Sequence, residues 1–487
     1  MRVGRWMCAL LLAASFGGAS APGAQAPDRT KPPQPGPTPV LKLPAIQKRQ
    51  LSNGLPVWIV ERHGVPVVQV NLVVLHGSAD DPAGKFGLTS LMTAMLEDGA
   101  GSRSALQIAD AIDFLGADLG IASTFDASAI RMHVPVARLA EALPIMADVA
   151  LRPTFPQEEL DRLRQQRLTA ILQARDDPSS IASQAFPRVL YGTTHRYGTP
   201  TAGTAATIKA AMVADLREQY AAVFRPDSAT LVVVGDVRPD SVIPLLEAGF
   251  SSWRSSGTAQ PVRLPAVEEP LKREVYLVDK PGAAQSQIRI GWIGVARSTP
   301  DYFPVQVMNT ILGGSFSSRL NMNLREQHGY TYGASSSFDM RASAGPFVAG
   351  AGVQTDKTAE SLTEFFNELN GILKTVPEDE VERAKSYVAL RFPSAFESTS
   401  DISRRLEDML IYHLPDDYFA TYVHNIEAVS PSEVARVAHK YVQPGRFAVV
   451  VVGDRKIIEP GIRALNLGTL KLLSIDEVFG PSPAGEK

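Results

Sequence analysis

The chain contains an internal repeat, and this repeat constrains its fold more than any other feature of the sequence. VWIVERHG at 57–64 resembles VYLVDKPG at 275–282, which begins 218 positions later. FRPDSATLVVVGDV at 224–237 resembles VQPGRFAVVVVGDR at 442–455, again at a spacing of 218. Matches that keep their order and their spacing indicate that one structural unit occurs twice.

A third match supports the duplication and helps to define its limits. FPQEELDRLR at 155–164 resembles VPEDEVERAK at 376–385. The chain has 487 residues, more than one hydrophobic core usually organises. We therefore predict an N-terminal lobe at 46–253 and a C-terminal lobe at 273–480, separated by a polar, proline-containing linker at 254–272.

Each lobe is expected to mix helices and strands. Valine-rich runs such as ATLVVVGDV have strand composition and length. Segments such as LAEALPIMADVAL place apolar residues three and four positions apart, as amphipathic helices do. Strands that return after helices favour an α+β fold in which each lobe is an α/β sandwich, with helices on one face of its sheet.

The first residues have the features of a targeting segment. Arg2 and Arg5 precede the short apolar run WMCALLLAASF, and small residues follow as far as Ala26. This run is shorter than the roughly 20 apolar residues of a spanning helix. A membrane anchor or a buried N-terminal helix is the weaker alternative. We predict a signal peptide at 1–26, export to the periplasm or beyond, and a proline-rich tether at 27–45.

Composition excludes several classes of function. The only cysteine, Cys8, lies within the predicted signal peptide, so the mature chain would form no disulfide and use no catalytic thiol. A formal net charge of −3 over the whole length gives no basic surface for nucleic acid and no charge block for a membrane surface.

The segment KFGLTSLMTAMLEDGAG, Lys85 to Gly101, predicts a helix that begins at a glycine. Five of its residues form one apolar stripe for packing, namely Leu88, Leu91, Met92, Met95 and Leu96. Ser90, Thr93, Ala94 and Glu97 fall on the other side. Glu97 and Asp98, at the helix end, are expected to be solvated.

This segment resembles the start of the insulinase, pitrilysin and processing-peptidase family of zinc metallopeptidases. In that family a G-L-x-H-x-x-E-H-M-x-x-x-G segment carries two zinc-binding histidines and a glutamate base. Here the histidine positions are Ser90 and Ala94, and the glutamate position is Thr93. Two histidines at i and i+4 can share a zinc ion, and the glutamate takes a proton from its bound water. A hydroxymethyl, a methyl and a threonine hydroxyl do neither.

The third ligand of the family is a glutamate on a later helix, which corresponds to about Leu168–Leu172, and LTAIL contains no acid. No two of the eight histidines stand three to five residues apart, so we expect them to serve packing and surface roles rather than metal binding. The resemblance therefore implies a duplicated metallopeptidase roll, with two lobes forming a clamshell, a degenerate metal site and no zinc in this chain.

The second lobe keeps a different part of the resemblance. ILGGSFSSRLNMNLREQHGYTYGASSSF, Ile311 to Phe338, is similar to the family's substrate-contact segment, in which an arginine precedes a tyrosine by seven positions. That pair is Arg325 and Tyr332 here. In the family, the pair reaches across a closed chamber to the peptide being cut. The alternative is that Arg325 pairs with Glu326 on a helix surface and that Tyr332 packs on a sheet.

The resemblance implies a non-catalytic, substrate-binding subunit of an exported heterodimeric zinc metalloendopeptidase. A homologous partner would carry the zinc and hydrolyse the peptide, while this inactive homologue would contribute Arg325 and Tyr332. The alternative is a non-enzymatic protein of the same fold that binds peptides or acts as a scaffold. A self-sufficient hydrolase with another site is a third alternative, which the joint absence of the ligands and the base disfavours.

Overall fold

The computed structural model describes residues 44–255, 264 and 273–483. The described residues belong to one compact unit. The predicted signal peptide at 1–26 lies outside the described residues, as do most of the tether at 27–45 and most of the linker at 254–272. The predicted limits of these segments stay predictions.

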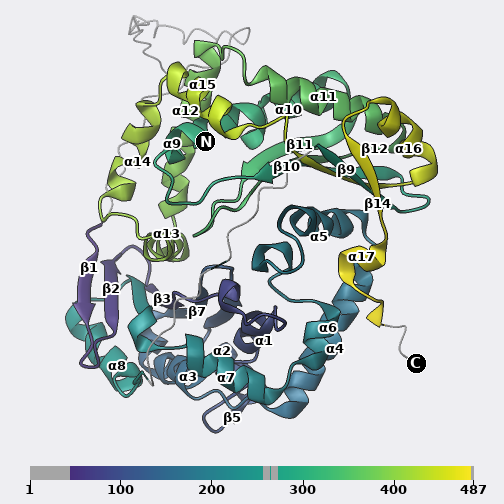
Figure 1. The fold of residues 1–487 in the computed structure, drawn as a ribbon. Coiled ribbons are helices and arrows are strands. Elements are labelled where there is room, and N and C mark those ends of the chain that lie inside the picture. Colours follow the sequence, from purple (N-terminus) through teal and green to yellow (C-terminus); the bar gives the residue numbers. More distant parts are fainter. Residues whose placement is uncertain (1–43, 256–263, 265–272, 484–487) are drawn as a thin grey trace, which may run out of the picture. The chain divides into compact units, whose positions relative to one another are not determined.

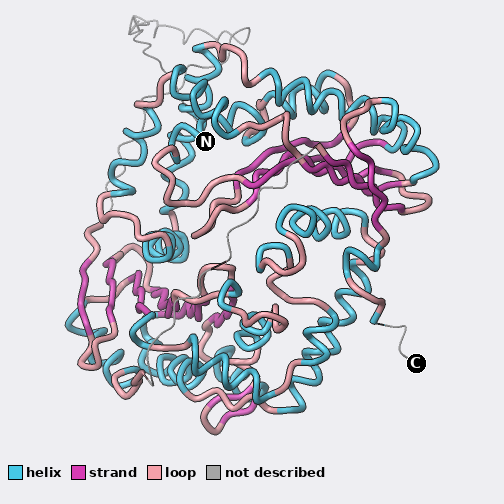
Figure 2. Tube along the Cα trace, viewed as in Figure 1, coloured by secondary structure: helices cyan, strands magenta, loops and turns pink. Residues whose placement is uncertain are grey.

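Two six-stranded sheets organise the described residues, and Figure 2 shows them in magenta. The first sheet contains β1 (Gln47–Gln50), β2 (Pro56–Glu61), β3 (Val67–Val74), β6 (Asp118–Ser123), β7 (Ser128–Pro135) and β8 (Ala229–Gly235). The second sheet contains β9 (Glu274–Asp279), β10 (Gln285–Ile293), β11 (Thr331–Phe338), β12 (Pro346–Gln354), β13 (Ala448–Gly453) and β14 (Thr469–Leu473). β4 (Gly99–Ala100) and β5 (Arg103–Ser104) form a small separate pair.

The two sheets have the same strand order over five strands, which confirms the duplication. The first sheet runs β1-β2-β8-β3-β7-β6, and the second, taken from its other edge, runs β14-β9-β13-β10-β12-β11. The repeated glycines occupy the same register, because Gly235 pairs with Glu61 and Gly453 pairs with Asp279 in equivalent parallel ladders. The sheets differ at one edge, where β1 is antiparallel to β2 but β14 is parallel to β9.

The first half of the chain supplies eight α-helices to the described structure (Figure 1). They are α1 (Leu88–Ala94), α2 (Ala105–Phe114), α3 (Leu139–Leu151), α4 (Gln157–Ala174), α5 (Pro178–Tyr191), α6 (Ala205–Ala210), α7 (Val213–Val223) and α8 (Pro239–Phe250). One hydrophobic core joins a face of the first sheet to α1, α2, α3, α7 and α8. Leu88, Leu91, Met92, Met95 and Leu96 are all buried in it, which confirms the predicted stripe.

The second half repeats this arrangement with its own helices. They are α9 (Tyr302–Asn309), α10 (Arg319–Asn321), α11 (Thr358–Gly371), α12 (Glu378–Arg391), α13 (Thr399–Ile411), α14 (Tyr418–Glu427), α15 (Pro431–Tyr441), α16 (Arg455–Ala464) and α17 (Ile475–Phe479). A second core joins one face of the second sheet to residues of α9, α11, α12, α15 and α16.

Each sheet is also covered on its other face, by a helix from the opposite half of the chain. α13 packs on β3 and β8, and α5 packs on β10 and β13. The expectation of helices on one face was therefore incomplete. The reason is visible in the strands, since every residue of β8 and of β13 is buried. A strand that is apolar on both sides needs cover on both faces.

A partly buried ion pair fixes α13 to the first sheet. Glu407 of α13 accepts from Arg131 Nε at 2.9 Å and from Arg131 Nη2 at 2.6 Å. Asn71 Nδ2 also donates to Glu407 Oε1, at 2.6 Å. Because the Glu407 carboxylate is buried and uses both oxygens, α13 has one defined position along β3 and β7.

Candidate functional site

The helix that resembles a catalytic helix is held at its first turn by Asp81. This carboxylate accepts from the backbone amides of Gly87 at 2.6 Å and Thr89 at 2.7 Å, so it satisfies two of the free donors at the start of α1. Gly87 has φ of 101°, and a Cβ there would lie 2.5 Å from the Cα of Gly203. Glycine is thus required where α1 begins.

Asp81 is paired with Arg196, and both side chains are buried. Arg196 Nε lies 3.0 Å from Asp81 Oδ2 and also donates to the carbonyl of Ser78. Its Nη1 donates to the carbonyl and the hydroxyl of Thr199. Burial raises the pKa of Asp81, and the positive charge of Arg196 opposes that rise. The pair joins α1 to the loop that follows α5.

None of the three metal-site positions on α1 carries a side chain that binds metals in proteins. Thr93 is buried, and its hydroxyl donates to the carbonyl of Thr89 at 2.9 Å, one helical turn back. Ser90 and Ala94 are half-buried. These hydroxyl and methyl groups do not fit a zinc ion, which takes imidazole, thiolate or carboxylate ligands in proteins.

An arginine of α4 lies against this part of α1. Arg167 Nη2 donates to the carbonyl of Ser90 at 2.8 Å and lies 3.2 Å from the Ser90 hydroxyl. Burial lowers the pKa of Arg167 to about 10, so the guanidinium keeps its charge near neutral pH. Sequence reasoning placed the lost third ligand at Leu168–Leu172 and missed Arg167, although this cation directly precedes that stretch.

A fixed positive charge beside Ser90 disfavours a metal cation there. Within 44–255 and 273–483, no three His, Cys, Asp or Glu side chains cluster in a way that could hold a metal ion. The expectation that Asp98 is solvated is wrong, because Asp98 is buried and its carboxylate lies 2.8 Å from Arg162 Nη2. Arg162 of α4 is thus the ion-pair partner of this acid, which lies just after α1.

Arg325 lies in the π-helical segment η6 (Met322–Gln327), and its side chain is 39% exposed. Its Nε is 3.3 Å from Glu326 Oε1, and its guanidinium lies over the ring of Phe316, 4.7 Å from the ring centre. The sequence had suggested the contact with Glu326 as the alternative role of Arg325. Phe316 was not foreseen, and its ring holds the guanidinium from one side.

Tyr332 lies on β11, the edge strand of the second sheet, and is 88% exposed. The pairing of β11 with β12 is irregular here. Thr331 pairs with Val353 and Ala334 with Ala351, so one extra residue of β11 is accommodated between them. A bulge of this kind turns a side chain away from the regular alternation of a strand. The alternative that Tyr332 packs on a sheet face does not hold.

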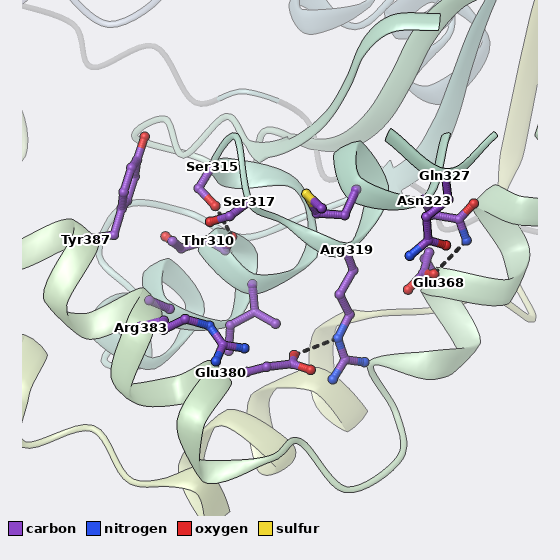
Figure 3. Close-up of a pocket in the computed structure, with 13 residues that line it drawn as sticks. Thr310, Ser315, Ser317, Arg319, Asn323, Gln327, Glu368, Glu380, Arg383 and Tyr387 are labelled. Carbon is purple, nitrogen blue, oxygen red and sulfur yellow. Dashed lines mark hydrogen bonds and ion pairs between the residues drawn. The ribbon is translucent and has the colours of Figure 1, made fainter. Parts of the chain in front are cut away.

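Part-buried polar contacts hold η6 and the preceding α10 to neighbouring helices. Arg319 Nε lies 2.8 Å from Glu380 Oε2, and Asn323 Nδ2 donates to Glu368 Oε1 at 2.8 Å. Figure 3 shows these two contacts beside a cavity of about 240 Å³. They tie the segment that carries Arg325 to α11 and α12, so the backbone of η6 is fixed even though the Arg325 side chain is not enclosed.

Two family models match successive parts of this chain. The model described as Insulinase (Peptidase family M16) matches residues 57–205, and the model described as Peptidase M16 inactive domain matches residues 211–388. The chain belongs to peptidase family M16. The first match covers the lobe with α1, and the second covers the segment with Arg325 and Tyr332. The family resemblance that the sequence suggested is thus confirmed.

Sequence similarity to known relatives extends over most of the chain. An uncharacterized zinc protease of Streptomyces coelicolor is 25% identical over 425 residues, which are 84% of this chain and 90% of that protein. An uncharacterized zinc protease of Bacillus subtilis is 24% identical over 369 residues, 75% of this chain and 88% of that protein. These names describe the relatives, whereas this M16 chain has Ser90, Thr93 and Ala94 where the family's motif has its metal site.

Solved structures share the fold. The crystal structure of a peptidase M16 inactive domain from Pseudomonas fluorescens superposes with a TM-score of 0.78 at 26% identity, over 84% of this chain and 98% of that one. The crystal structure of a protease from Helicobacter pylori gives a TM-score of 0.75 at 21% identity, over 84% of this chain and all of that one (100%). Both confirm the expected fold of two sheet-containing lobes.

Proposed function

We propose that this M16 chain is the non-catalytic, substrate-binding subunit of an exported heterodimeric zinc metalloendopeptidase. A homologous partner subunit supplies the zinc ion, its histidine ligands and the glutamate base. This chain supplies Arg325 and Tyr332 to the chamber that encloses the peptide. The reaction is hydrolysis of a peptide bond, and this chain alone does not catalyse it.

The observation that carries the proposal is the contrast between the two lobes. The three metal-site positions of α1 cannot bind zinc, whereas Tyr332 stands 88% exposed on a bulged edge strand. A phenol hydroxyl and a guanidinium, directed at the carbonyl oxygen where negative charge develops, stabilise a tetrahedral intermediate. The guanidinium also suits a carbonyl or carboxylate better than a flexible ammonium does.

One contact favours a second candidate, a non-enzymatic peptide-binding or scaffold protein of the same fold. Arg325 already has an anionic neighbour, because its Nε is 3.3 Å from Glu326. In the scaffold role Arg325 keeps this partner and no peptide is cut. In the peptidase role the guanidinium leaves Glu326 when substrate arrives, which costs little because the pair is exposed to solvent.

Export is part of the proposal, and it rests on Arg2, Arg5 and the short apolar run that follows them. Among the described residues, no helix has the length and apolar character needed to cross a membrane. Fractionation of the native host, followed by mass spectrometry of the mature N-terminus, tests this part. Recovery of the intact N-terminus from the cytoplasm would contradict export.

Co-purification tests the main proposal. The tagged chain is isolated from its native host, and proteins recovered with it are identified and assayed for zinc and for peptide cleavage. We expect a zinc-bearing homologue with an H-x-x-E-H segment, and cleavage by the complex but not by this chain alone. One tightly held zinc ion per isolated chain would contradict the proposal. A complex that contains the homologue but gains no activity from this chain would favour the scaffold role.

A further inference from the structure

Arg167 is a half-buried cation that contacts no carboxylate directly among the described residues. Its hydrogen bonds go to the carbonyl of Ala202 at 3.2 Å and to the carbonyl and hydroxyl of Ser90. All of these acceptors are neutral. Taking a charge out of water is costly unless an opposite charge or a full set of acceptors compensates for it. The environment of Arg167 is therefore incomplete in the described structure.

The acidic group whose charge acts on Arg167 is Asp81, and it already has partners. Its two oxygens accept from the amides of Gly87 and Thr89, and Arg196 is its ion-pair partner. Arg196 thus balances this carboxylate, and the charge of Arg167 has no carboxylate in contact among the described residues. An anion at this place would restore the balance.

Donors remain available for such an anion. A guanidinium has five N–H groups, and the three contacts of Arg167 involve only Nη1 and Nη2. The Ser90 hydroxyl lies 3.2 Å from Arg167 Nη2 as an acceptor, and its own hydrogen has no acceptor among the described contacts. Arg167, Ser90 and Ala94 are all half-buried, so solvent reaches this face of α1.

We propose that Arg167 and Ser90 form a carboxylate-binding site on the degenerate helix, and that its ligand is the C-terminal carboxylate of a peptide. The planar guanidinium matches the two oxygens of a carboxylate, and Ser90 adds a hydroxyl donor. The inference deepens the proposed function, since it takes the ligand to be a peptide. In this site a fixed cation takes the place of the metal and holds the end of a chain without cutting it.

Titration calorimetry on the isolated chain tests the site. The probes are N-acetylated penta-alanine with a free C-terminal carboxylate and the same peptide with a C-terminal amide. We expect the carboxylate form to bind about tenfold more tightly or better, the effect of a hydrogen-bonded charge. Arg167→Gln should abolish this preference, and Arg167→Lys should keep part of it because the charge remains.

The matched control is Arg404→Gln, which removes an exposed arginine on α13 and should leave the preference unchanged. Should Arg167→Gln fail to fold, Ser90→Ala and Arg167→Lys should each reduce the preference severalfold. Equal affinity for the two peptides, no binding of either at up to about 10 mM, or an unchanged preference in the Arg167 and Ser90 variants would overturn the proposal. This test uses the chain without a partner, so its failure is distinct from failure of the reconstituted peptidase.

Discussion

At the residue scale, the start of α1 depends on the buried ion pair between Asp81 and Arg196. Asp81 satisfies two backbone amides of α1. Arg196 neutralises it while donating to four backbone carbonyls nearby, those of Ser78, Thr199, Pro200 and Thr201. Such a pair specifies where α1 begins, because moving the helix by one residue would break both amide contacts. The start of the helix is thus set by these contacts and needs no metal ligand on α1.

Asp81→Ala tests this role. The substitution leaves the fully buried Arg196 without its counter-ion and two amides without an acceptor. Removing one partner of a buried pair costs about 3–5 kcal/mol, and we expect a loss of that size in the free energy of unfolding measured with urea. Asp416→Ala is the control, since Asp416 forms an exposed pair with Lys48 that should contribute less than about 1 kcal/mol. Equal small losses in both variants would contradict the role.

Residue-level prediction from the sequence succeeded where the relevant contacts are local. Ser90, Thr93 and Ala94 could be placed on one helix from its periodicity alone. Arg167 could not, because its contact with Ser90 joins residues 77 positions apart on two helices. The exposed position of Tyr332 could be predicted only in part. The glycine that follows it, Gly333, is a signal for a bulge inside a strand, but only the paired strand shows where the extra residue lies.

At the element scale, α9 is anchored to α15 by a cluster around Asp301. Its carboxylate accepts from Arg436 at 2.7 Å, Lys440 at 2.8 Å and Tyr441 at 2.6 Å. The hydrogen bond from Arg436, together with those from Lys440 and Tyr441, lowers the pKa of Asp301 well below its usual range. The folded state thus binds the proton more weakly than the unfolded state does.

The stabilisation from Asp301 should depend on pH with a definite sign. It is fully present above the pKa of the unfolded chain, about 3.9, and is lost as the pH falls from there through the lower folded pKa. Asp301→Asn should therefore lower the urea midpoint clearly at pH 7, and the difference from the parent chain should shrink below pH 4. A difference that grows toward acid pH would contradict the assignment. Asp417→Asn, at the start of α14 and more exposed, serves as the control.

The order of the elements could be predicted better than the faces they cover. The repeat predicts equivalent strands, and the structure places them in equivalent registers. The sequence repeat did not reveal that α5 and α13 each cover the sheet of the opposite half of the chain. The unbroken apolar runs of β8 and β13 indicate that both faces of each sheet are covered. Such a run does not indicate which helix covers the second face.

At the scale of the whole molecule, α5 and α13 each cover the sheet of the opposite half, so the stability of each half depends on the other. Leu406, Met409 and Leu410 of α13 pack with Val232 and Val234 of the first sheet. Ile181 and Phe186 of α5 pack with Val450 and Val452 of the second. Neither sheet can bury both faces with its own half of the chain, so we expect the two lobes to unfold together.

Leu406→Ala tests this dependence. Removing a buried leucine typically costs about 2–5 kcal/mol, and its neighbours here are strands of the first sheet. Hydrogen exchange followed by mass spectrometry should show faster exchange in β3 and β8, although the substitution lies in the second half of the chain. Arg404→Ala, an exposed position on the same helix, should leave that exchange unchanged. Faster exchange confined to the second half would contradict the interdependence.

In the proposed heterodimer, this chain completes the partner's active site with Arg325 and Tyr332. Steady-state peptide cleavage by the reconstituted pair measures what these two residues contribute. Arg325→Ala and Tyr332→Phe should assemble normally by size, as should the control Arg463→Ala on the exposed surface of α16. Loss of one donor to the developing oxyanion lowers kcat about a hundredfold or more. Because the contact strengthens as charge develops, KM should change little. Unchanged turnover in both variants, with assembly intact, would remove these residues from the mechanism and leave the scaffold role.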